Sequence, residues 1–494
     1  MRKNLFLVSG LLAATLFTAC NNEEISMPQG DNEASQELVL ALSDGSLNMA
    51  RSSNAFARAA AAAGIGDAGA INAFGRPLYS SMASQYIQNI KIYFVKDGKI
   101  ARVVNVDKDY WKQSLAYNNG RKLTISLKGD KKLNTGKYIV YAMAYSTNHG
   151  YDTVVPSLET AQGETFDATT FSATASADPS EIFAGQATVL AVKSETEVGL
   201  KSNKGEALVT LYRQVAGISG YFKNIPANVD GDVPTHLRLV ASGKNTKVLF
   251  GELDTNVGDA ADKVNVNHVM NGAEAAALTN NDGKFAVSNK EGYVVYEIKL
   301  DNWFTEGFAK ADKNQDGFVN SDDVKAGAIW VNPNAKVNGH VQGLVQGTVW
   351  GGKFVIPFAQ VENVPTLQLQ LVQKDIDGTV NLLKYWNIKV DKRSTTASAV
   401  ELPTGAITTV TGDKSEEVYN IYRNHMYSIG KKNFDNGNQK PTEPVDPDKP
   451  VNPIDPIDPV DPDENNQPGD LSKGQDLTIH VNSNWEAVHD MEID

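Results

Sequence analysis

The last eighteen residues, 477–494, alternate between two kinds of side chain. One set of alternate positions is mostly apolar: Leu477, Ile479, Val481, Ser483, Trp485, Ala487, His489, Met491 and Ile493. The other set is almost entirely polar. Alternation with a period of two predicts a β-strand with one apolar and one wet face, whereas an amphipathic helix needs a spacing near 3.6. We interpret His489, on the apolar face, as a packed strand residue rather than a base.

A proline-rich segment precedes this strand. Prolines occupy every third position from 441 to 462. Because polyproline II has three residues per turn, this spacing predicts a stiff rod with the prolines along one ridge. At about 3.1 Å per residue, residues 441–468 can span about 85 Å, roughly twice the diameter of a 200-residue domain. A strand on such a tether can reach another molecule. The alternative is that the tail folds back onto its own domain or stays solvated.

A second alternating segment lies near the N-terminus. It consists of Leu38, Leu40 and Leu42 with Val39, Ala41 and Ser43 between and after them, and this pattern predicts a strand. Small and polar residues follow, and Arg51 and Arg58 lie among them. Such a loop is accessible to a protease, so Arg51 is the first candidate cleavage site and Arg58 the second. Cleavage there would separate the strand from the body of the protein.

The N-terminus has the features of an export signal. Arg2 and Lys3 precede an apolar run over residues 5–17, and Cys20 follows shortly after. The run is too short to span a membrane as a helix. Cys20 is the only cysteine, so no disulfide can form within the chain. Its position resembles a bacterial lipobox, with Phe17 in place of the usual leucine, and this implies lipidation on its sulfur. Ordinary signal cleavage is the alternative.

The body between these ends shows recurring strand patterns. They lie at 87–95, 123–127, 138–145, 208–215, 237–240, 294–300 and 367–372, with turn residues such as Asp97 and Gly98 between them. Few segments show helical periodicity, and the body is too long for one ordinary domain. We therefore predict a mainly β protein with two tandem β-sandwich domains of transthyretin-like or Greek-key type, a few short helices, and exchangeable N- and C-terminal strands. The boundary is placed within 224–234, where Pro226, Gly231 and Pro234 interrupt the pattern.

The predicted organisation has six parts. They are a lipoprotein signal peptide at 1–19, a lipidated leader with a removable strand at 20–51, β-sandwich domains at 52–230 and 231–440, a polyproline II linker at 441–470, and a C-terminal strand at 471–494. The net charge of −13 argues against a nucleic-acid partner, because a phosphate-binding protein needs a basic surface.

One segment has the spacing of a calcium-binding loop. Residues 312–323 fit the pattern DxNxDGxxNxxD of EF-hand and dockerin loops. The candidate ligands are Asp312, Asn314, Asp316, the carbonyl of Phe318, Asn320 and Asp323. Gly317 would allow the sharp turn that brings them together, while Gly327 interrupts the helix expected to follow. We predict a structural Ca²⁺ here, with a turn rich in Asn, Asp and Gly that holds no ion as the alternative.

Signals for catalysis are weak. The stretch GIGDAG at 64–69 fits GxGxxG but follows a run of alanines rather than a buried strand, so it does not indicate dinucleotide binding. The sequence contains no HExxH, GxSxG or Walker motif, and its seven histidines show no metal-binding spacing. Carboxylates are plentiful, but nothing selects a glycosidase pair among them. We expect that the protein is not an enzyme.

The features at the two ends together resemble those of the fimbrillins of Bacteroidetes type V pili, most closely the stalk subunit of the short-fimbria type. The stretches that carry the resemblance are LTIHVNSNWEAVHDMEID at the C-terminus, YNIYRNHMYSIGKKNF before the linker, and TGKYIVYAMAY around Tyr138. The resemblance covers the architecture of the whole chain, but only about a fifth of it residue by residue.

The resemblance implies a route of assembly. The subunit would reach the outer membrane as a lipoprotein anchored through Cys20, and an arginine-specific protease would cut after Arg51 or Arg58. Loss of the N-terminal strand would open an apolar groove, which the C-terminal strand of a neighbouring pilin would fill. The donor residues would be Leu477, Ile479, Val481, Trp485, Ala487, Met491 and Ile493. The mature protein would then lie in surface fimbriae that mediate adhesion.

Three functional classes follow from the sequence. The first is a structural subunit of a pilus, with a stalk position favoured because the chain has both a cleavage loop and a donor strand. The second is a monomeric surface lipoprotein that binds glycan or host protein, which needs neither feature. The third is a secreted enzyme, which would show a polar cleft.

Overall fold

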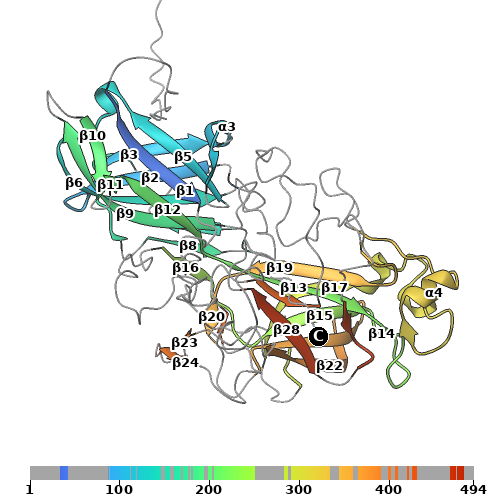
Figure 1. Ribbon diagram of the computed structural model, residues 1–494. Coiled ribbons are helices and arrows are strands. Elements are labelled where there is room, and N and C mark those ends of the chain that lie inside the picture. The colour runs from blue at the N-terminus through green and yellow to red at the C-terminus, as the bar shows by residue number, and fades with distance from the viewer. Residues whose placement is uncertain are drawn as a thin grey trace, which may run out of the picture.

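The computed structural model describes residues 34–42, 87, 89–111, 113–117, 120–145, 151–155, 161–168, 171–175, 179, 182–193, 198–202, 205–250, 283–286, 291–333, 344–359, 365–390, 399–401, 407–409, 420–421, 426–430, 468–473 and 476–482. The protein is mainly β, as predicted, and its strands gather in two lobes (Figure 1). None of the helices within these residues is long and apolar enough to cross a membrane.

The first domain is one continuous series of strands in the order β3-β2-β6-β9-β12-β1-β5-β4, with β10 and β11 attached to β9. Its strands are β1 (Gln36–Leu42), β2 (Asn89–Lys96), β3 (Lys99–Asp107), β4 (Leu115–Tyr117), β5 (Gly120–Leu127), β6 (Gly136–Tyr145), β9 (Ile182–Lys193), β10 (Val198–Ser202), β11 (Gly205–Glu206) and β12 (Leu208–Arg213). Buried side chains from β2, β3, β6 and β9 share one core with those from β1, β5 and β12, so the series folds over on itself as a sandwich.

The β2–β3 hairpin shows how local sequence sets this fold. Asp97 has φ 52° and Gly98 has φ 73°. Two successive residues with positive φ form the type of two-residue turn whose twist suits a hairpin, and Asp-Gly is a preferred sequence for it. The predicted strand at 87–95 and the predicted turn at Asp97 and Gly98 both appear in this hairpin.

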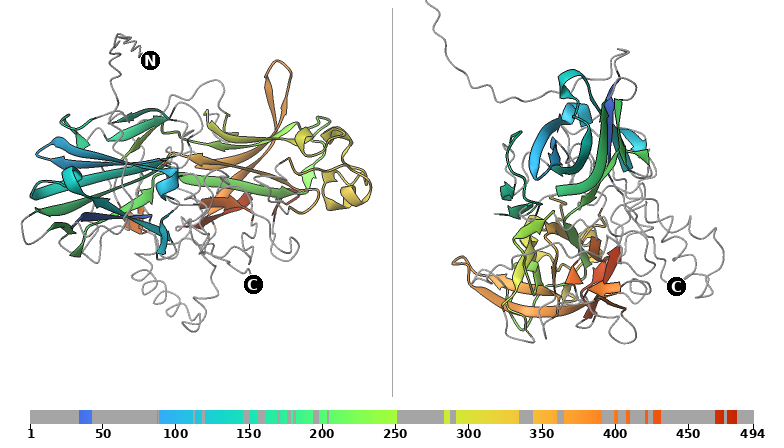
Figure 2. Two further views of the ribbon diagram at one scale, coloured as in Figure 1. Left: turned by 90° about the horizontal axis from the view of Figure 1, so that it is seen from above. Right: turned by 90° about the vertical axis from the view of Figure 1, so that its left-hand side faces the viewer.

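The second domain is a sheet in the order β17-β15-β21-β22-β28-β26-β13-β19, with β27 attached to β13. Its strands are β13 (Ala216–Lys223), β15 (His236–Ala241), β17 (Tyr293–Lys299), β19 (Val349–Val355), β21 (Leu367–Lys374), β22 (Val380–Val390), β26 (Met426–Ile429), β27 (Gly469–Asp470) and β28 (Asp476–Asn482). The hairpin of β21 and β22 projects from the body of the domain (Figure 2). The core beneath this sheet contains Trp386, Tyr221 and Trp350 among its large side chains.

The remaining elements are short. They are β7 (Tyr151–Val155), β8 (Ser172–Ala175), β14 (Ile225–Pro226), β16 (Lys247–Leu249), β18 (Phe318–Val319), β20 (Phe358–Ala359), β23 (Ala399–Glu401), β24 (Ile407–Thr409) and β25 (Asn420–Ile421), the helices α3 (Lys108–Trp111) and α4 (Ser321–Lys325), and the 3₁₀ helices η2 (Gly129–Lys131), η5 (Leu300–Asn302) and η6 (Phe308–Lys310).

The chain passes from the first sheet to the second within two residues. β12 ends at Arg213 and β13 begins at Ala216, and Gln214 and Val215 between them are fully buried. The change of sheet therefore lies upstream of the stretch 224–234, where the sequence places the boundary. Pro226 lies in β14 instead, and Gly231 and Pro234 lie in the connection from β14 to β15.

The two domains share a third core. Tyr93, Tyr141 and Phe171 from the first domain pack in it with Phe250 and Phe354. A small sheet also crosses the junction, because β16 pairs antiparallel with β8, and β8 pairs with β7. The junction is therefore a packed interface with shared backbone hydrogen bonds.

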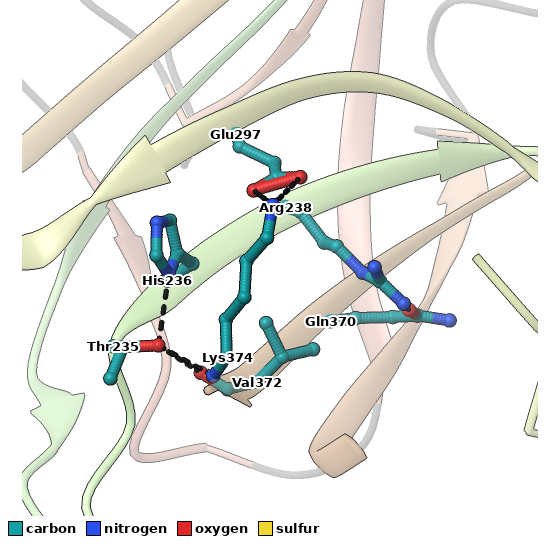
Figure 3. Close-up of polar contacts among 7 residues, drawn as sticks. All are labelled: Thr235, His236, Arg238, Glu297, Gln370, Val372 and Lys374. Atoms are coloured by element: carbon teal, nitrogen blue, oxygen red, sulfur yellow. Dashed lines mark hydrogen bonds and ion pairs between the residues drawn. The ribbon is translucent and has the colours of Figure 1, made fainter. Parts of the chain in front are cut away.

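A polar cluster ties three strands of the second domain together (Figure 3). The Thr235 hydroxyl accepts a hydrogen bond from the Lys374 backbone N–H at 2.8 Å and lies 2.9 Å from Nδ1 of His236. Arg238 donates from Nε and one terminal nitrogen to the Gln370 side-chain oxygen, at 3.0 and 2.9 Å. Burial lowers the pKa of His236, an effect that the carboxylate of Glu297 opposes. The cluster joins β15 to its neighbours β17 and β21.

Candidate strand-exchange site

The predicted N-terminal strand occupies an interior position in the first sheet. β1 pairs antiparallel with β5 along its whole length, from Gln36 opposite Leu127 to Leu42 opposite Arg121. Its other edge pairs parallel with β12, from Val39 opposite Leu208 to Leu42 opposite Leu211. Figure 1 shows β1 lying between these two strands. Removal of β1 would therefore leave two unpaired strand edges facing each other across a gap.

The side chains of β1 are buried on both faces. Leu38 and Leu40 are 0% exposed and belong to the first core with Ile125 of β5 and Val209 of β12. Val39 on the other face is 3% exposed. Full burial of such side chains contributes about 1.5 to 3 kcal/mol each. An empty β1 site would therefore expose a groove that is both apolar and rich in free backbone hydrogen-bonding groups.

A buried glutamine fixes one end of β1. Gln36 is 0% exposed, and its side-chain oxygen accepts a hydrogen bond from the Leu133 backbone N–H at 2.6 Å. Its Nε2 donates to the carbonyls of Leu133 at 3.0 Å and Val192 at 3.3 Å. No pattern in the sequence marks Gln36 as part of this site. Its polar side chain gives no hydrophobic signal, and its main partner lies 97 residues away in the chain.

The described part of the C-terminal tail lies in the chain's own second sheet. β28 pairs parallel with β22, from Asn387 opposite Asp476 to Val390 opposite Ile479. It pairs antiparallel with β26, from Ile429 opposite Ile479 to Met426 opposite Asn482. Leu477 is 8% exposed and belongs to the second core. Residues 476–482 therefore lie as expected if the tail folds back onto its own domain.

The structure places only some of the predicted site residues. Leu477, Ile479 and Val481 lie in β28. The other residues predicted for lipidation, cleavage and strand donation lie outside the described residues: Cys20, Arg51, Arg58, Trp485, Ala487, Met491 and Ile493, together with the linker prolines at 441–462.

The backbone of the predicted calcium loop makes the turn that the motif requires. Gln315 has φ 59° and Gly317 has φ 88°. Oδ2 of Asp312 accepts a hydrogen bond from the Gly317 N–H at 3.1 Å. Oδ1 of Asp312 is buried and has no hydrogen-bond partner. A buried carboxylate oxygen without a partner is costly, and a bound cation would satisfy it.

Other carboxylates of this loop bind its own backbone. Asp323 is 0% exposed, and its Oδ1 accepts from the N–H groups of Lys313 at 2.8 Å and Asn314 at 3.2 Å. Its Oδ2 accepts from the Asn320 N–H at 2.9 Å, which completes a capping box at the start of α4. Within the described residues, no three His, Cys, Asp or Glu side chains form a group that could hold a metal ion. A calcium site here would therefore depend on the asparagines and the Phe318 carbonyl as well as on Asp312 and Asp316.

No family model matches the sequence, and no curated protein matches it. Solved structures of similar proteins include a fimbrial assembly protein from Parabacteroides distasonis, with 13% identity and a TM-score of 0.26, covering 71% of this chain and 98% of that one. They also include the tip fimbrial protein Mfa3 from Porphyromonas gingivalis, with 9% identity and a TM-score of 0.27, covering 80% of this chain and 94% of that one.

Proposed function

We propose that this protein is a structural subunit of a cell-surface pilus, in the stalk position. A protease would remove the N-terminal strand after Arg51 or Arg58, and the C-terminal strand of a neighbouring subunit would take its place. Before cleavage the subunit would be held at the outer membrane by lipid on Cys20. The role would be mechanical, with no catalytic step.

One observation supports this proposal: β1 is an interior strand that pairs with β5 and β12, so its removal would open a groove between them. Loss of an interior strand is costly, because it exposes apolar side chains and leaves backbone groups unpaired. A groove of this kind favours addition of an extended segment from another molecule, since backbone hydrogen bonds supply affinity and the side-chain pockets supply specificity.

One observation favours the second function, a monomeric surface lipoprotein. β28 pairs with β22 and β26 of its own chain, so the tail can serve simply as a strand of its own domain. Under the pilus proposal this self-pairing belongs to the subunit before assembly. The tail would leave its own sheet when a cleaved neighbour offers an empty groove.

Gel electrophoresis of surface material without boiling separates the two functions. A strand-exchange polymer should give a ladder of bands that boiling collapses to a monomer. Deletion of 471–494 should abolish the ladder, because the incoming strand is lost. The deletion also removes β28 and the buried Leu471 from the second domain, so the deleted subunit must be shown to reach the surface as a folded monomer. A single unboiled band from the wild-type protein, after its N-terminal strand has been cleaved, would favour the monomeric function.

We also propose that loop 312–323 binds Ca²⁺ as a structural ion. The support is the twelve-residue ligand spacing, the positive φ angles of Gln315 and Gly317, and the unpartnered Oδ1 of Asp312. Phe318, whose backbone carbonyl is a candidate ligand, lies in β18. This strand pairs with β14, which follows directly after β13 in the chain. An ion here would therefore stabilise one end of the second domain.

A further inference from the structure

The tail contains a segment with the same pattern of residue types as the N-terminal strand. Residues 36–42 read QELVLAL, and residues 475–481 read QDLTIHV. In both, a glutamine is followed by an acidic residue, a leucine, a β-branched residue, and aliphatic residues at the fifth and seventh positions. The identical positions are Gln36 with Gln475 and Leu38 with Leu477.

The two segments also have the same kind of place in their sheets. β1 lies between β12, which is parallel to it, and β5, which is antiparallel. β28 lies between β22, which is parallel, and β26, which is antiparallel. A strand that fits one of these positions has the backbone direction needed for the other.

We propose that residues 475–481 of a second copy of this chain fill the emptied β1 groove in the register of residues 36–42. This inference rests on the proposed function and specifies the occupant, its direction and its register. Leu477 takes the position of Leu38 opposite Ile125, and Ile479 that of Leu40 opposite Leu123. The amide of Gln475 takes the place of Gln36 against the backbone of Leu133.

The side chains of the second copy suit this register. Asp476 replaces the exposed Glu37, and Thr478 replaces Val39 with a side chain of nearly the same shape. The Gln475 amide is the key group. Loss of β1 leaves the Leu133 N–H and C=O without the partner that Gln36 supplied, and only a group with both a donor and an acceptor satisfies them together. Two positions fit less closely: Thr478 brings a hydroxyl to the position of Val39, which is 3% exposed, and His480 is larger than the methyl group of the buried Ala41.

The groove also offers more backbone pairing than the tail has in its own sheet. Within the described residues, β28 pairs with β22 over 476–479 and with β26 over 479–482. β1 pairs with β5 over all of 36–42 and with β12 over 39–42. A strand that takes the register of β1 therefore gains a full-length antiparallel partner, which favours transfer of the tail to a cleaved neighbour.

Disulfide trapping tests the register. Val39 is directly opposite Thr124, so the register places Thr478 of one subunit opposite Thr124 of the next. Directly opposed residues of an antiparallel pair are close enough for a disulfide. The double variant T124C/T478C should give a ladder that resists boiling without reductant and collapses with reductant. Cleavage after Arg51 removes Cys20, the only native thiol.

A second double variant provides the matched control. The far end of the tail also alternates, and a register with Met491 at position 38 and Ile493 at position 40 would place Glu492 opposite Thr124. T124C/E492C should therefore not give a boiling-resistant ladder. Cross-linking of T124C/E492C alone, or of neither variant while the unboiled ladder persists, would overturn the register and leave strand exchange intact. Absence of any unboiled ladder from the cleaved wild-type protein would instead overturn the proposed function.

The Gln475 amide has its own test. Q475L should lower the temperature at which the unboiled ladder dissociates, because leucine cannot satisfy the Leu133 backbone groups. The matched variant Q467L changes a glutamine outside the register and should leave that temperature unchanged. Equal dissociation temperatures for Q475L and the wild-type protein would overturn the role given to Gln475.

Discussion

At the scale of single residues, buried polar side chains bind backbone groups that no strand or helix satisfies. Gln36 does this at the end of β1, where it holds the backbone of Leu133. Asp323 does it in the loop 312–323, where its carboxylate accepts three backbone N–H groups. Each is 0% exposed, so its removal would leave backbone groups buried without partners, at a cost of about 1 to 3 kcal/mol per group.

The calcium proposal is tested at this scale by removing one ligand. Ca²⁺ at 100 times its dissociation constant should stabilise the wild-type protein by about 2.7 kcal/mol, because it binds only the folded state. Because the two domains are expected to unfold together as a unit of about 400 residues, with an unfolding entropy of about 2.1 cal/mol/K per residue, this raises Tm by about 3 °C. D312N should abolish the difference in Tm between Ca²⁺ and EGTA. D322N, which changes an exposed neighbouring carboxylate outside the ligand pattern, should preserve it. A wild-type Tm that is the same in Ca²⁺ and in EGTA would refute the calcium site.

His236 gives a prediction about pH. Burial lowers the pKa of its imidazole in the folded protein below the value of about 6.5 in the unfolded chain. Between the two pKa values the unfolded state binds more protons, so the free energy of unfolding falls as pH decreases below about 6.5. H236N should reduce the slope of that free energy between pH 6.5 and 5, measured by urea unfolding. An unchanged slope in H236N would show that other groups cause the acid destabilisation.

At the scale of elements, β1 and β28 each lie between one parallel and one antiparallel strand. β1 pairs with β5 along its whole length and buries leucines in the first core. β5 and β12, which flank β1, follow the proposed cleavage site in the chain, so under the proposed function the same side chains would line the groove before and after strand exchange. The groove can therefore be tested in both states with one substitution.

Ile125 is the residue for that test, because it is 0% exposed and lies opposite Leu38. I125A should lower the free energy of unfolding of the uncleaved subunit by about 2 to 5 kcal/mol through loss of burial and creation of a cavity. It should also lower the temperature at which the unboiled ladder dissociates. T124A changes the exposed neighbour on the same strand and should alter neither quantity appreciably. A destabilised precursor with a fully stable ladder would mean that the incoming strand does not contact Ile125.

At the scale of the whole molecule, the two domains form one packed unit. The third core, the β8–β16 pairing and the short β12–β13 connection all cross the junction. A junction with a shared core transmits load without a flexible hinge. Under the proposed function, such a junction would carry tension from the groove in the first domain to the tail that follows the second.

Phe250 tests this coupling, because it is 0% exposed in the shared core and its ring centroid lies 4.8 Å from that of Phe171. F250A should cost about 3 to 5 kcal/mol and weaken the contact between the domains. Calorimetry should then resolve two unfolding transitions in place of one. I376A, at the fully exposed tip of the β21–β22 hairpin, should retain the wild-type profile. Two transitions already present in the wild-type protein would contradict the coupling.

The amino-acid sequence by itself determined the class of fold, the strand at 36–42, the strand at 477–482 and the β2–β3 turn. Each of these depends on the period and backbone preference of neighbouring residues, so local pattern suffices. Only the tertiary structure decided that β1 is interior, that Gln36 binds Leu133, and that residues 476–482 pair within their own domain. These features depend on partners distant in the chain, and alternation shows that a strand has an apolar face without showing which two strands will flank it. The change of sheet at Gln214 and Val215 could not be predicted from the sequence, because this junction is buried and no proline or glycine marks it.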